Sequence, residues 1–419
     1  MSMIQMKDSG ISWIGNIPND WKCCKQKYVI KLINGRAYSE SEFEEDGKYK
    51  ILRVGNLFTN PVWYYSNMEL EDDKYCINGD LLYSWSMSYA PVIWTGDKVI
   101  YHYHIWKAQL GRQIDKLFAY YYLIALTDAL KSEIHETTMG FVTMGVMNNS
   151  YIAYPLSLDK QKQISNYLHN VCCEIDNLIK DLQEQIDTLD QYRRSIITEA
   201  VTHGLKLESK TKDSGIVWMG QIPSHWQVIK TKYLFEIVKR IAGEEGYDVL
   251  SVTQQGLKVK DLNDYGGQIA ESYAGYQFVY PEDFVMNHMD LLTGWVDYSD
   301  KFGVTSPDYR VFRLLDKKAN SLDYFKYVFQ CCYLDKIYYS LGNGVAGVGR
   351  WRLQAHTFKN FRLPVPPLEE QVAIAKYLDE KCSLIAQYID ENKQKIAILQ
   401  DYKKSIIYEY VTGKKEVPA

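Results

Sequence analysis

The segment KDSGISWIGNIPNDWKCCKQKY at residues 7–28 returns as KDSGIVWMGQIPSHWQVIKTKY at residues 212–233. The two copies are offset by 205 residues and are identical at 13 of 22 positions, which chance does not produce. An internal repeat of this kind decides the architecture of a chain. We therefore interpret the chain as two related halves.

A second pair of matching segments lies downstream, at residues 158–202 and 368–412. They are offset by 210 residues without gaps, and 17 of 45 positions are identical. Between the matched segments the two halves differ widely, apart from a weak echo of residues 79–82 in residues 282–285. The pattern indicates two constant frames that hold two variable inserts. An enzyme duplicated for catalysis would instead be expected to keep its reactive residues in both halves.

Both downstream segments predict long helices, because apolar residues recur at steps of three and four with no internal proline or glycine. Gly204 and Gly413, just past the two ends, are typical helix stops. A segment of this length makes a rod of about 60–65 Å. Such helices cannot bury themselves in domains of ~150 residues, so we expect them to pack on each other, antiparallel. The predicted apolar stripes are Ile164, Leu168, Val171, Ile175, Leu178, Leu182, Ile186, Leu189, Tyr192 and Ile196, and Ile374, Leu378, Ile385, Ile389, Ile396, Leu399, Tyr402 and Ile406.

The globular parts have a mixed pattern. Strand-like stretches occur at residues 51–54, 81–85, 91–94 and 99–110, and helical stretches at 118–130 and 324–339. The predicted fold is a duplicated α/β (α+β) domain, joined by two long antiparallel helices that form a coiled coil with pseudo-two-fold symmetry. The predicted boundaries are a first domain at 1–156, a helix at 157–203, a second domain at 204–366, a helix at 367–413 and a tail at 414–419.

Composition excludes several classes of protein. The chain is 46% hydrophobic and 24% charged, as ordinary globular proteins are. It has no apolar run of the ~18 residues that a membrane helix needs and no secretion signal at residues 1–10, so we expect a cytoplasmic protein. The net charge is −4, and the helical segments 157–203 and 367–413 carry −3 and −2. A nucleic-acid-binding surface would therefore have to be a local patch on the globular parts.

Eight cysteines occur, six of them in three adjacent pairs, and none forms a C-x-x-C motif. The spacing therefore signals neither a zinc site nor a redox pair. We expect reduced thiols that act as small buried apolar side chains.

Catalytic signals are weak. Residues 342–347 match G-x-G-x-x-G, but a dinucleotide site needs that motif between a strand and a helix, so a flexible loop is favoured. Residues 60–63, Asn-Pro-Val-Trp, half resemble the Asn-Pro-Pro-aromatic site of amino-methyltransferases and fit a turn better. His102 and His104 would lie on one face of a strand as a possible metal pair, without a third ligand nearby. Polar strand residues, or contact with a base or phosphate, are the alternatives.

These residues together resemble the specificity subunits of type I restriction-modification enzymes, over nearly the whole chain. Residues 13–21 and their copy 218–226 are similar to the W-x-G-x-I-P-x-x-W opening of that family's recognition domains. Residues 366–378 are similar to the P-P-L-x-E-Q-x-x-I-x-x-Y-L start of its conserved helix. The first copy, at residues 155–161, departs because it lacks the double proline and the Glu-Gln pair.

The resemblance implies a division of labour. Each globular part would be a target-recognition domain that reads one half of a bipartite site in double-stranded DNA. The helices would separate the two domains and dock two methylation subunits. Those subunits would bind S-adenosylmethionine and methylate adenine, and motor-nuclease subunits would cleave unmethylated DNA. The resemblance transfers no catalytic residue, metal or cofactor to this chain.

Candidate DNA contacts follow from the chemistry of base edges, which Arg and Lys read at guanine and Asn and Gln at adenine. In the first domain we expect them among Arg53, Asn56, Ser84, Ser86, His102, His104 and Lys107. In the second we expect them at Asn343, Arg350 and Arg352 of the Gly-rich loop, with Gln254, Gln255 and His288 as further candidates. The alternative for each is a solvated surface residue.

The sequence leaves two rival functions open. A fused nuclease or methyltransferase half would need a cofactor loop or a metal-carboxylate cluster. A coiled-coil scaffold that never contacts DNA would select no bipartite consensus. The sequence predicts neither the target bases nor the spacer length.

Overall fold

The computed structural model describes residues 5–86, 88–135, 142–206, 210–261, 270–344 and 351–418. Contacts divide the chain into two compact units. The first unit comprises Met1–Leu182 and Gln394–Ala419, and the second comprises Gln183–Lys393. Each of the two long helices therefore contributes one part to each unit.

Among its described residues, the globular part of the first unit has twelve strands and three α-helices before the first long helix. In chain order these are β1 (Met6–Asp8), β2 (Asn16–Pro18), β3 (Trp21–Lys25), β4 (Ile30–Asn34), β5 (Tyr49–Leu52), α1 (Val54–Phe58), β6 (Tyr64–Ser66), β7 (Tyr75–Cys76), β8 (Leu81–Ser84), β9 (Ala90–Ile93), β10 (Val99–Tyr101), β11 (Ile105–Leu110), α2 (Lys116–His135), α3 (Met144–Asn149), β12 (Tyr151–Pro155) and the long helix α4 (Leu158–His203).

The second unit repeats the order of the frame elements but differs in the elements between them. Its elements are β13 (Thr211–Asp213), β14 (Gln221–Pro223), β15 (Gln227–Lys230), α5 (Thr231–Leu234), β16 (Phe235–Val238), β17 (Leu250–Thr253), β18 (Gly256–Val259), β19 (Gln277–Val279), β20 (Phe284–Met286), β21 (Val296–Tyr298), β22 (Gly303–Thr305), β23 (Arg310–Leu314), α6 (Leu322–Leu334), α7 (Ile337–Ser340), α8 (Ala355–Asn360), β24 (Arg362–Val365) and the long helix α9 (Leu368–Val411). The duplicated mixed fold and the two long helices are confirmed.

A four-stranded antiparallel sheet forms the frame of each unit. Its strand order is β4-β11-β8-β9 in the first unit and β16-β23-β20-β21 in the second. Trp106 of β11 stands opposite Tyr83 and Asn34, and Phe312 of β23 stands opposite Phe284 and Ile237. The shared frame thus extends well beyond the segments whose sequences match.

The inserts carried by this frame differ. The first unit adds a mixed sheet of order β6-β5-β10-β7, in which β5 and β10 are parallel. The second unit has two short antiparallel pairs, the hairpin β17-β18 and the pair β19-β22, and a parallel bridge joins Val249 to Val304. Unlike inserts on like frames are what the sequence predicts.

Two predicted elements were wrong in extent. Residues 99–110 form not one strand but β10 and β11, which belong to different sheets. The break comes at His102, whose carbonyl accepts from Ile105 N in a tight turn (2.9 Å) while its backbone bridges Arg36. Residues 324–339 are likewise interrupted, because Lys336 adopts a left-handed conformation (φ 55°) between α6 and α7.

The repeated tryptophan of the opening segment is a core residue in both units. Trp21 is 2% exposed and meets Phe118 edge-on at 6.2 Å, and Trp226 is 0% exposed. Each packs against a glycine that ends a long helix. A Cβ on Gly204 would meet the Trp226 ring at 3.0 Å, and one on Gly413 would clash with Pro18 beside Trp21. Only glycine allows this approach, and both glycines have positive φ (77° and 72°).

A buried glutamine starts each long helix. Gln161 and Gln371 are both 0% exposed. Their Oε1 atoms accept from the backbone N–H of Asp115 (2.7 Å) and Ser321 (2.8 Å), and their Nε2 atoms donate to the carbonyl of the proline that precedes the helix (2.7 and 2.9 Å). The first copy therefore keeps the functional part of the motif, although the double proline and the glutamate are missing.

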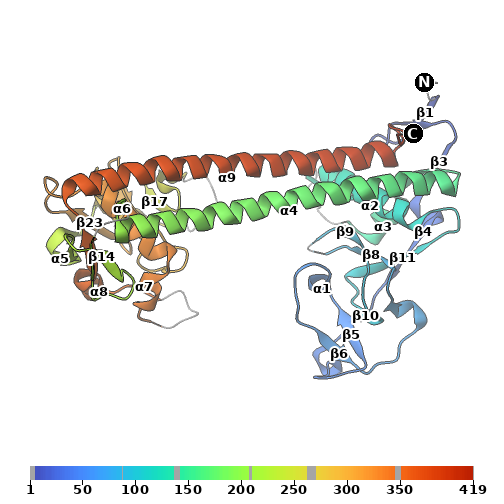
Figure 1. The fold of residues 1–419 in the computed structure, drawn as a ribbon. Coiled ribbons are helices and arrows are strands. Elements are labelled where there is room, and N and C mark those ends of the chain that lie inside the picture. Colours follow the sequence, from blue (N-terminus) through green and yellow to red (C-terminus); the bar gives the residue numbers. More distant parts are fainter. Residues whose placement is uncertain are drawn as a thin grey trace. The chain divides into compact units, whose positions relative to one another are not determined.

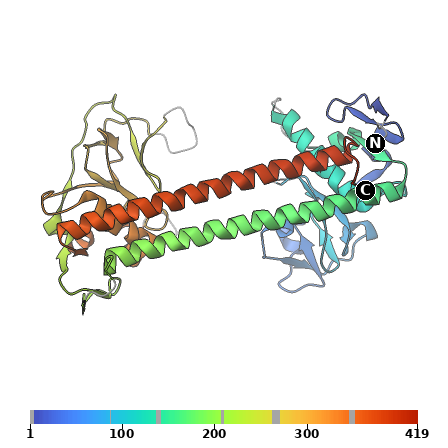
Figure 2. The same ribbon diagram turned by 45° about the horizontal axis from the view of Figure 1, so that its top comes forward.

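The long helices pair antiparallel within each unit, and both views show them side by side there (Figures 1 and 2). In the first unit the rings of Tyr167 and Tyr410 lie 4.8 Å apart, and Asp176 pairs with Lys403 at 2.6 Å. In the second unit Asn392 donates to Gln185 at 3.3 Å. The expected coiled-coil pairing is confirmed.

The seam between the helices differs from the predicted stripe at three positions. Leu178, Tyr192 and Tyr402 are 52%, 50% and 52% exposed. A coiled-coil seam averages 3.5 residues per turn, so the steps between its residues alternate between three and four. At these three positions the predicted stripe takes a step of three and therefore leaves the seam. The buried and half-buried seam positions are Ile175, Ile179, Leu182, Ile186, Leu189, Arg193 and Ile196 on α4, and Ile385, Ile389, Asn392, Ile396, Leu399, Lys403 and Ile406 on α9.

Two general expectations can be compared with the described residues. None of the helices among them combines the length and the apolar character needed to span a bilayer. All eight cysteines are free, but Cys173 is exposed, so the expectation of uniformly buried thiols was wrong. Residue 173 faces away from the helix seam, where solvent reaches it.

Candidate nucleic-acid interface

Aromatic rings gather at one end of the sheet frame in the first unit. Trp85 follows β8, and His102, Tyr103 and His104 precede β11; we call these four residues the ring platform. Trp85 Nε1 donates to the Tyr103 carbonyl (2.8 Å), and the Trp85 ring meets that of His104 edge-on at 5.1 Å. The Tyr103 and His104 rings are 4.0 Å apart, and Tyr103 is 38% exposed. The platform therefore presents ring surface to solvent from a fixed backbone.

His102 and His104 lie in the turn between two sheets, so placing them on one face of a strand was wrong. Their ring centroids are 4.8 Å apart. Burial lowers the pKa of His102 to about 4, with smaller contributions from His104 and Arg53. A neutral His102 ring belongs to the packed layer under Tyr103. Among the described His, Cys, Asp and Glu residues, no three converge as a metal site would require.

Arg53 lies at the start of α1, close enough to depress the pKa of both platform histidines. Its guanidinium stands 5.0 Å from the centre of the Tyr64 ring. Asn56 is engaged locally, because its Oδ1 accepts from Arg53 N (3.1 Å) and its Nδ2 donates to the carbonyls of Asn60 (3.0 Å) and Val62 (2.8 Å). Residues 60–63 form the turn that Asn56 closes. Arg53 is thus an exposed cation near the ring platform, and Asn56 holds its backbone.

Three further candidates, Ser84, Ser86 and Lys107, are buried or half-buried and are engaged within the first unit. Ser84 is 0% exposed and donates to the carbonyl of Ser86 (3.3 Å). Lys107 pairs with Asp80 (2.7 Å) and donates to the Tyr75 carbonyl (3.0 Å). These contacts fix the frame beside the ring platform.

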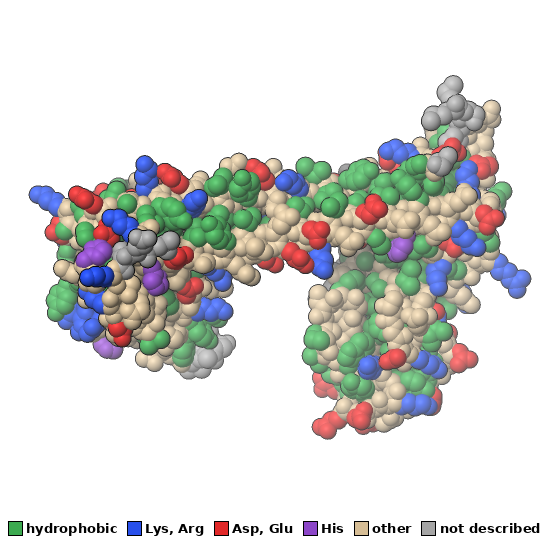
Figure 3. Space-filling view, in the orientation of Figure 1, with side chains coloured by type: hydrophobic (Ala, Val, Ile, Leu, Met, Phe, Trp, Pro, Cys, Tyr) green, Lys and Arg blue, Asp and Glu red, His purple; other side chains and the backbone are tan. Residues whose placement is uncertain are grey.

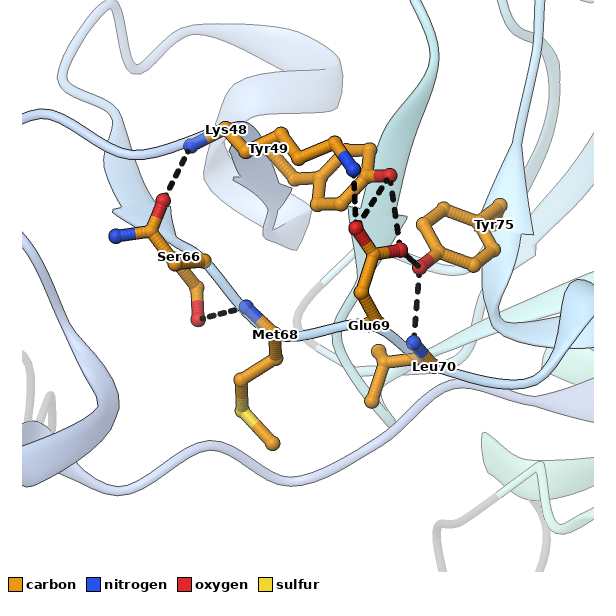
Figure 4. Close-up of polar contacts among 8 residues, drawn as sticks. Lys48, Tyr49, Ser66, Met68, Glu69, Leu70 and Tyr75 are labelled. Carbon is orange, nitrogen blue, oxygen red and sulfur yellow. Dashed lines mark hydrogen bonds and ion pairs between the residues drawn. The ribbon is translucent and has the colours of Figure 1, made fainter.

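The insert of the first unit is clamped by one carboxylate, as Figure 4 shows. Glu69 accepts from the hydroxyls of Tyr49 (3.1 Å) and Tyr75 (3.2 Å) and pairs with Lys48. The Lys48 ammonium lowers the pKa of Glu69. Leu70 N donates to the same Tyr75 hydroxyl (2.8 Å), so the segment between β6 and β7 is tied to β5. The cluster positions the insert and was not signalled by any sequence motif.

Cationic residues gather at the corresponding end of the second unit. Asn343 and Arg352 exchange two backbone hydrogen bonds (3.0 and 3.1 Å). Leu353 N donates to the His288 carbonyl (3.0 Å), and Arg310 Nη2 donates to the Leu353 carbonyl (2.7 Å). The structure thus brings His288 together with Asn343 and Arg352, from which it is distant in sequence.

Burial dominates the electrostatics of this cluster. Burial, together with smaller effects of Arg310 and Arg352, lowers the pKa of His288 to about 4. It also lowers the pKa of Arg310 to about 10. His288 Nδ1 and Arg352 Nε are buried and have no hydrogen-bond partner among the described residues. Sequence reasoning missed Arg310, because a lone arginine in an apolar strand gives no signal of what it will face.

The remaining candidates of the second unit are placed elsewhere. Gln254 and Gln255 form the turn between β17 and β18. Gln255 N donates to Thr253 Oγ1 (3.1 Å), and its side chain accepts from Lys258. Arg350 lies outside the described residues.

Comparisons with known proteins agree with this architecture. The family described as "Type I restriction modification DNA specificity domain" matches residues 18–188 and 223–406. The MjaVIII type I restriction enzyme specificity subunit of Methanocaldococcus jannaschii is 25% identical over 421 residues, 96% of this chain and 94% of that protein. The putative MjaX specificity subunit of the same organism is 23% identical, covering 96% of each chain. A chain from a solved structure of a type I R-M system has the same fold, with a TM-score of 0.64, 12% identity, and coverage of 95% of this chain and 99% of that one.

Proposed function

This chain belongs to the type I restriction-modification DNA specificity family, and we propose a role for each of its parts. Each globular part reads one half of a bipartite site in double-stranded DNA. The two long helices set the spacer between the half-sites and dock two methylation subunits. The chain is the specificity subunit of such a system, and methyl transfer and cleavage belong to its partners.

The observation that carries the proposal is one sheet frame with two unlike inserts. The frame repeats strand for strand, β4-β11-β8-β9 against β16-β23-β20-β21, while the inserts differ in topology. Direct readout requires different side chains wherever the bases differ. A common frame with unlike inserts is therefore the expected design for a protein that reads two different half-sites.

The spacer role follows from the continuity of the helices. α4 has 46 residues and α9 has 44, which at about 1.5 Å per residue gives about 65–70 Å for each. Paired helices resist bending, so they favour one separation and one helical phase of the half-sites, as dimeric DNA-binding proteins do.

The docking role is supported by apolar side chains that the seam leaves exposed (Figure 3). In the first unit these are Leu178 of α4 and Tyr402 of α9, 52% exposed each. In the second they are Tyr192 of α4 and Tyr388 of α9, 50% and 48% exposed. The repeat offset of 210 relates the first pair to the second. Scattered exposed apolar residues are normal, but a pair that recurs in each unit suits two copies of one partner.

The methylation subunits would also supply the cofactor. We propose that S-adenosylmethionine is held by the docked partner and that no catalytic residue comes from this chain. An adenine target has to leave the base stack to be methylated, so the assembled complex would bend or open the duplex. The motor-nuclease subunits would complete the system.

Selection of bound DNA from a random pool, with the methylation subunits present, tests the proposal. A consensus of two half-sites with a fixed spacer is expected. Exchanging residues 29–150 for those of another family member should change one half-site only. A change in both halves would contradict modular reading, and the absence of any bipartite consensus would favour a scaffold. Methylation or cleavage by the chain alone would favour the fused-enzyme alternative.

A further inference from the structure

Strand register makes Trp85 and His288 equivalent positions of the two units. Gly79 and Glu282 precede β8 and β20 with positive φ (88° and 72°) in matching turns, so the two strands align at an offset of 203. At that offset Trp85 corresponds to His288, two residues beyond the aligned strand residues Tyr83 and Met286.

The strands that pair with β8 and β20, which are β11 and β23, are equivalent in the same way. Trp106 stands opposite Tyr83 in the first unit, and Arg310 stands opposite Met286 in the second. Tyr83 and Met286 are themselves equivalent at the offset of 203. The same end of the sheet frame is therefore stacked aromatic in one unit, where Trp85 and Trp106 lie 5.7 Å apart, and cationic in the other.

Polar atoms at the cationic end lack partners within the described residues. His288 Nδ1 and Arg352 Nε are buried from solvent, yet neither forms a hydrogen bond there. Buried polar groups are normally paired, and each exception calls for an explanation. An arginine Nε–H can only donate, so an acceptor on a bound molecule would satisfy it once the side chain turns out of the position that now shields it from solvent.

We propose, resting on the function proposed above, that this end of the frame contacts bases in both units and does so by different chemistry. In the second unit Arg352 and His288 face an acceptor-rich base edge, that of guanine, while Arg310 is a positioning residue that holds the segment through the Leu353 carbonyl. In the first unit Tyr103 and Trp85 pack on the apolar edge that the thymine methyl group provides. Guanine O6 and N7 are the preferred partners of arginine, and the methyl group is the apolar feature of the major groove.

The test uses the full chain in complex with its methylation subunits and selection from a random DNA pool. Arg352→Gln should relax one position of the second half-site, with a loss of discrimination of about 5–150-fold, and should leave the first half-site intact. Arg313→Gln is the matched control, since Arg313 is exposed on β23 and paired with Glu236 (2.8 Å). His288→Asn should relax the same half-site and serves if Arg352→Gln does not fold.

The same selection experiment is made with a variant of the first unit. Tyr103→Ala should relax only the first half-site, because the backbone carbonyl that holds Trp85 stays in place. Tyr28→Ala is its control, as Tyr28 is 67% exposed in the same unit. Both controls should leave the consensus unchanged.

Three outcomes would overturn the inference. Uniformly weaker binding to all sequences, with the salt slope reduced by about 1, would make Arg352 a phosphate contact. An unchanged consensus in Arg352→Gln and His288→Asn would remove the cluster from the interface. Relaxation of the wrong half-site would contradict the equivalence of the two ends. If the unaltered chain selects no bipartite consensus, the proposed function itself fails. If only the inference fails, the unaltered chain still selects its bipartite consensus, so the two failures can be distinguished.

Discussion

Inserting one heptad into each long helix should lengthen the DNA spacer by about three base pairs. The insertions belong at Gln185 of α4 and Asn392 of α9, which face each other across the seam. Seven residues add about 10.5 Å of helix, and B-DNA rises about 3.4 Å per base pair. Because the seam repeats every seven residues, a heptad in both helices preserves its packing.

The rotation that accompanies this change predicts a loss of affinity. Three base pairs turn the DNA by about 105°, given 10–10.5 base pairs per turn. A heptad changes the phase of an α-helix by only ~20° relative to an ideal seam. The longer spacer should therefore be selected with both half-sites intact, but it should be bound more weakly than the original site, since the duplex has to twist to meet both domains.

Selection from a random pool, followed by binding titration on the selected sites, measures both effects. A four-residue insertion in both helices is the control, because it shifts the seam out of register and should abolish the fixed spacer. Unchanged spacing after the heptad insertion would refute the idea that the helices set the distance. A changed half-site sequence would refute the separation of roles between helices and domains.

Three further predictions follow from single residues. Asn392→Leu should raise the thermal unfolding temperature and broaden the range of selected spacers, because a polar seam residue fixes register at a cost in stability. Gln371→Ala should lower the free energy of unfolding by about 2–3 kcal/mol in urea titrations, since it orphans buried backbone groups, whereas Gln387→Ala on the exposed face should change it little. The pKa of His288 is lowered from 6.5 to about 4 in the fold, so the unfolded chain binds its proton first. The free energy of unfolding should consequently fall as pH drops from 6.5 to 4, and His288→Asn should flatten that slope.

The frame could be predicted from sequence because its residues are constrained both by packing and by backbone hydrogen bonds. Trp21 and Trp226 pack on helix-ending glycines, and Gln161 and Gln371 satisfy the backbone at helix starts. Such positions tolerate few side chains, so the repeat remains visible. The sheet order itself was not predicted, because its strands pair through the backbone and accept almost any apolar side chain.

The site was harder to predict because sequence does not reveal what a polar side chain faces. Lys107 was expected at DNA, and the structure pairs it with Asp80 (2.7 Å). Arg310 was not expected at all, and it lies at the centre of the cationic end. The platform histidines were placed on a strand that the turn at His102 interrupts. A turn between sheets depends on contacts with Arg36, which is distant in sequence.

One ion pair indicates how the two halves diverged without losing their frame. In the first unit Asp20 pairs with Lys160 (3.3 Å), and in the second the equivalent residues, His225 and Glu370, meet at 2.7 Å with the acid on the opposite partner. Glu370 also accepts from Trp226 Nε1 (2.9 Å), whereas Trp21 Nε1 has no partner among the described residues. Replacing Lys160 alone by glutamate would put two acids side by side. The two copies therefore keep this contact with the acid on opposite partners, and Lys160, which cannot accept a hydrogen bond, leaves the Trp21 indole without the bond that Glu370 gives to Trp226. A contact that keeps its place but exchanges its acid between the two partners leaves the frame intact, although the two copies carry different side chains there.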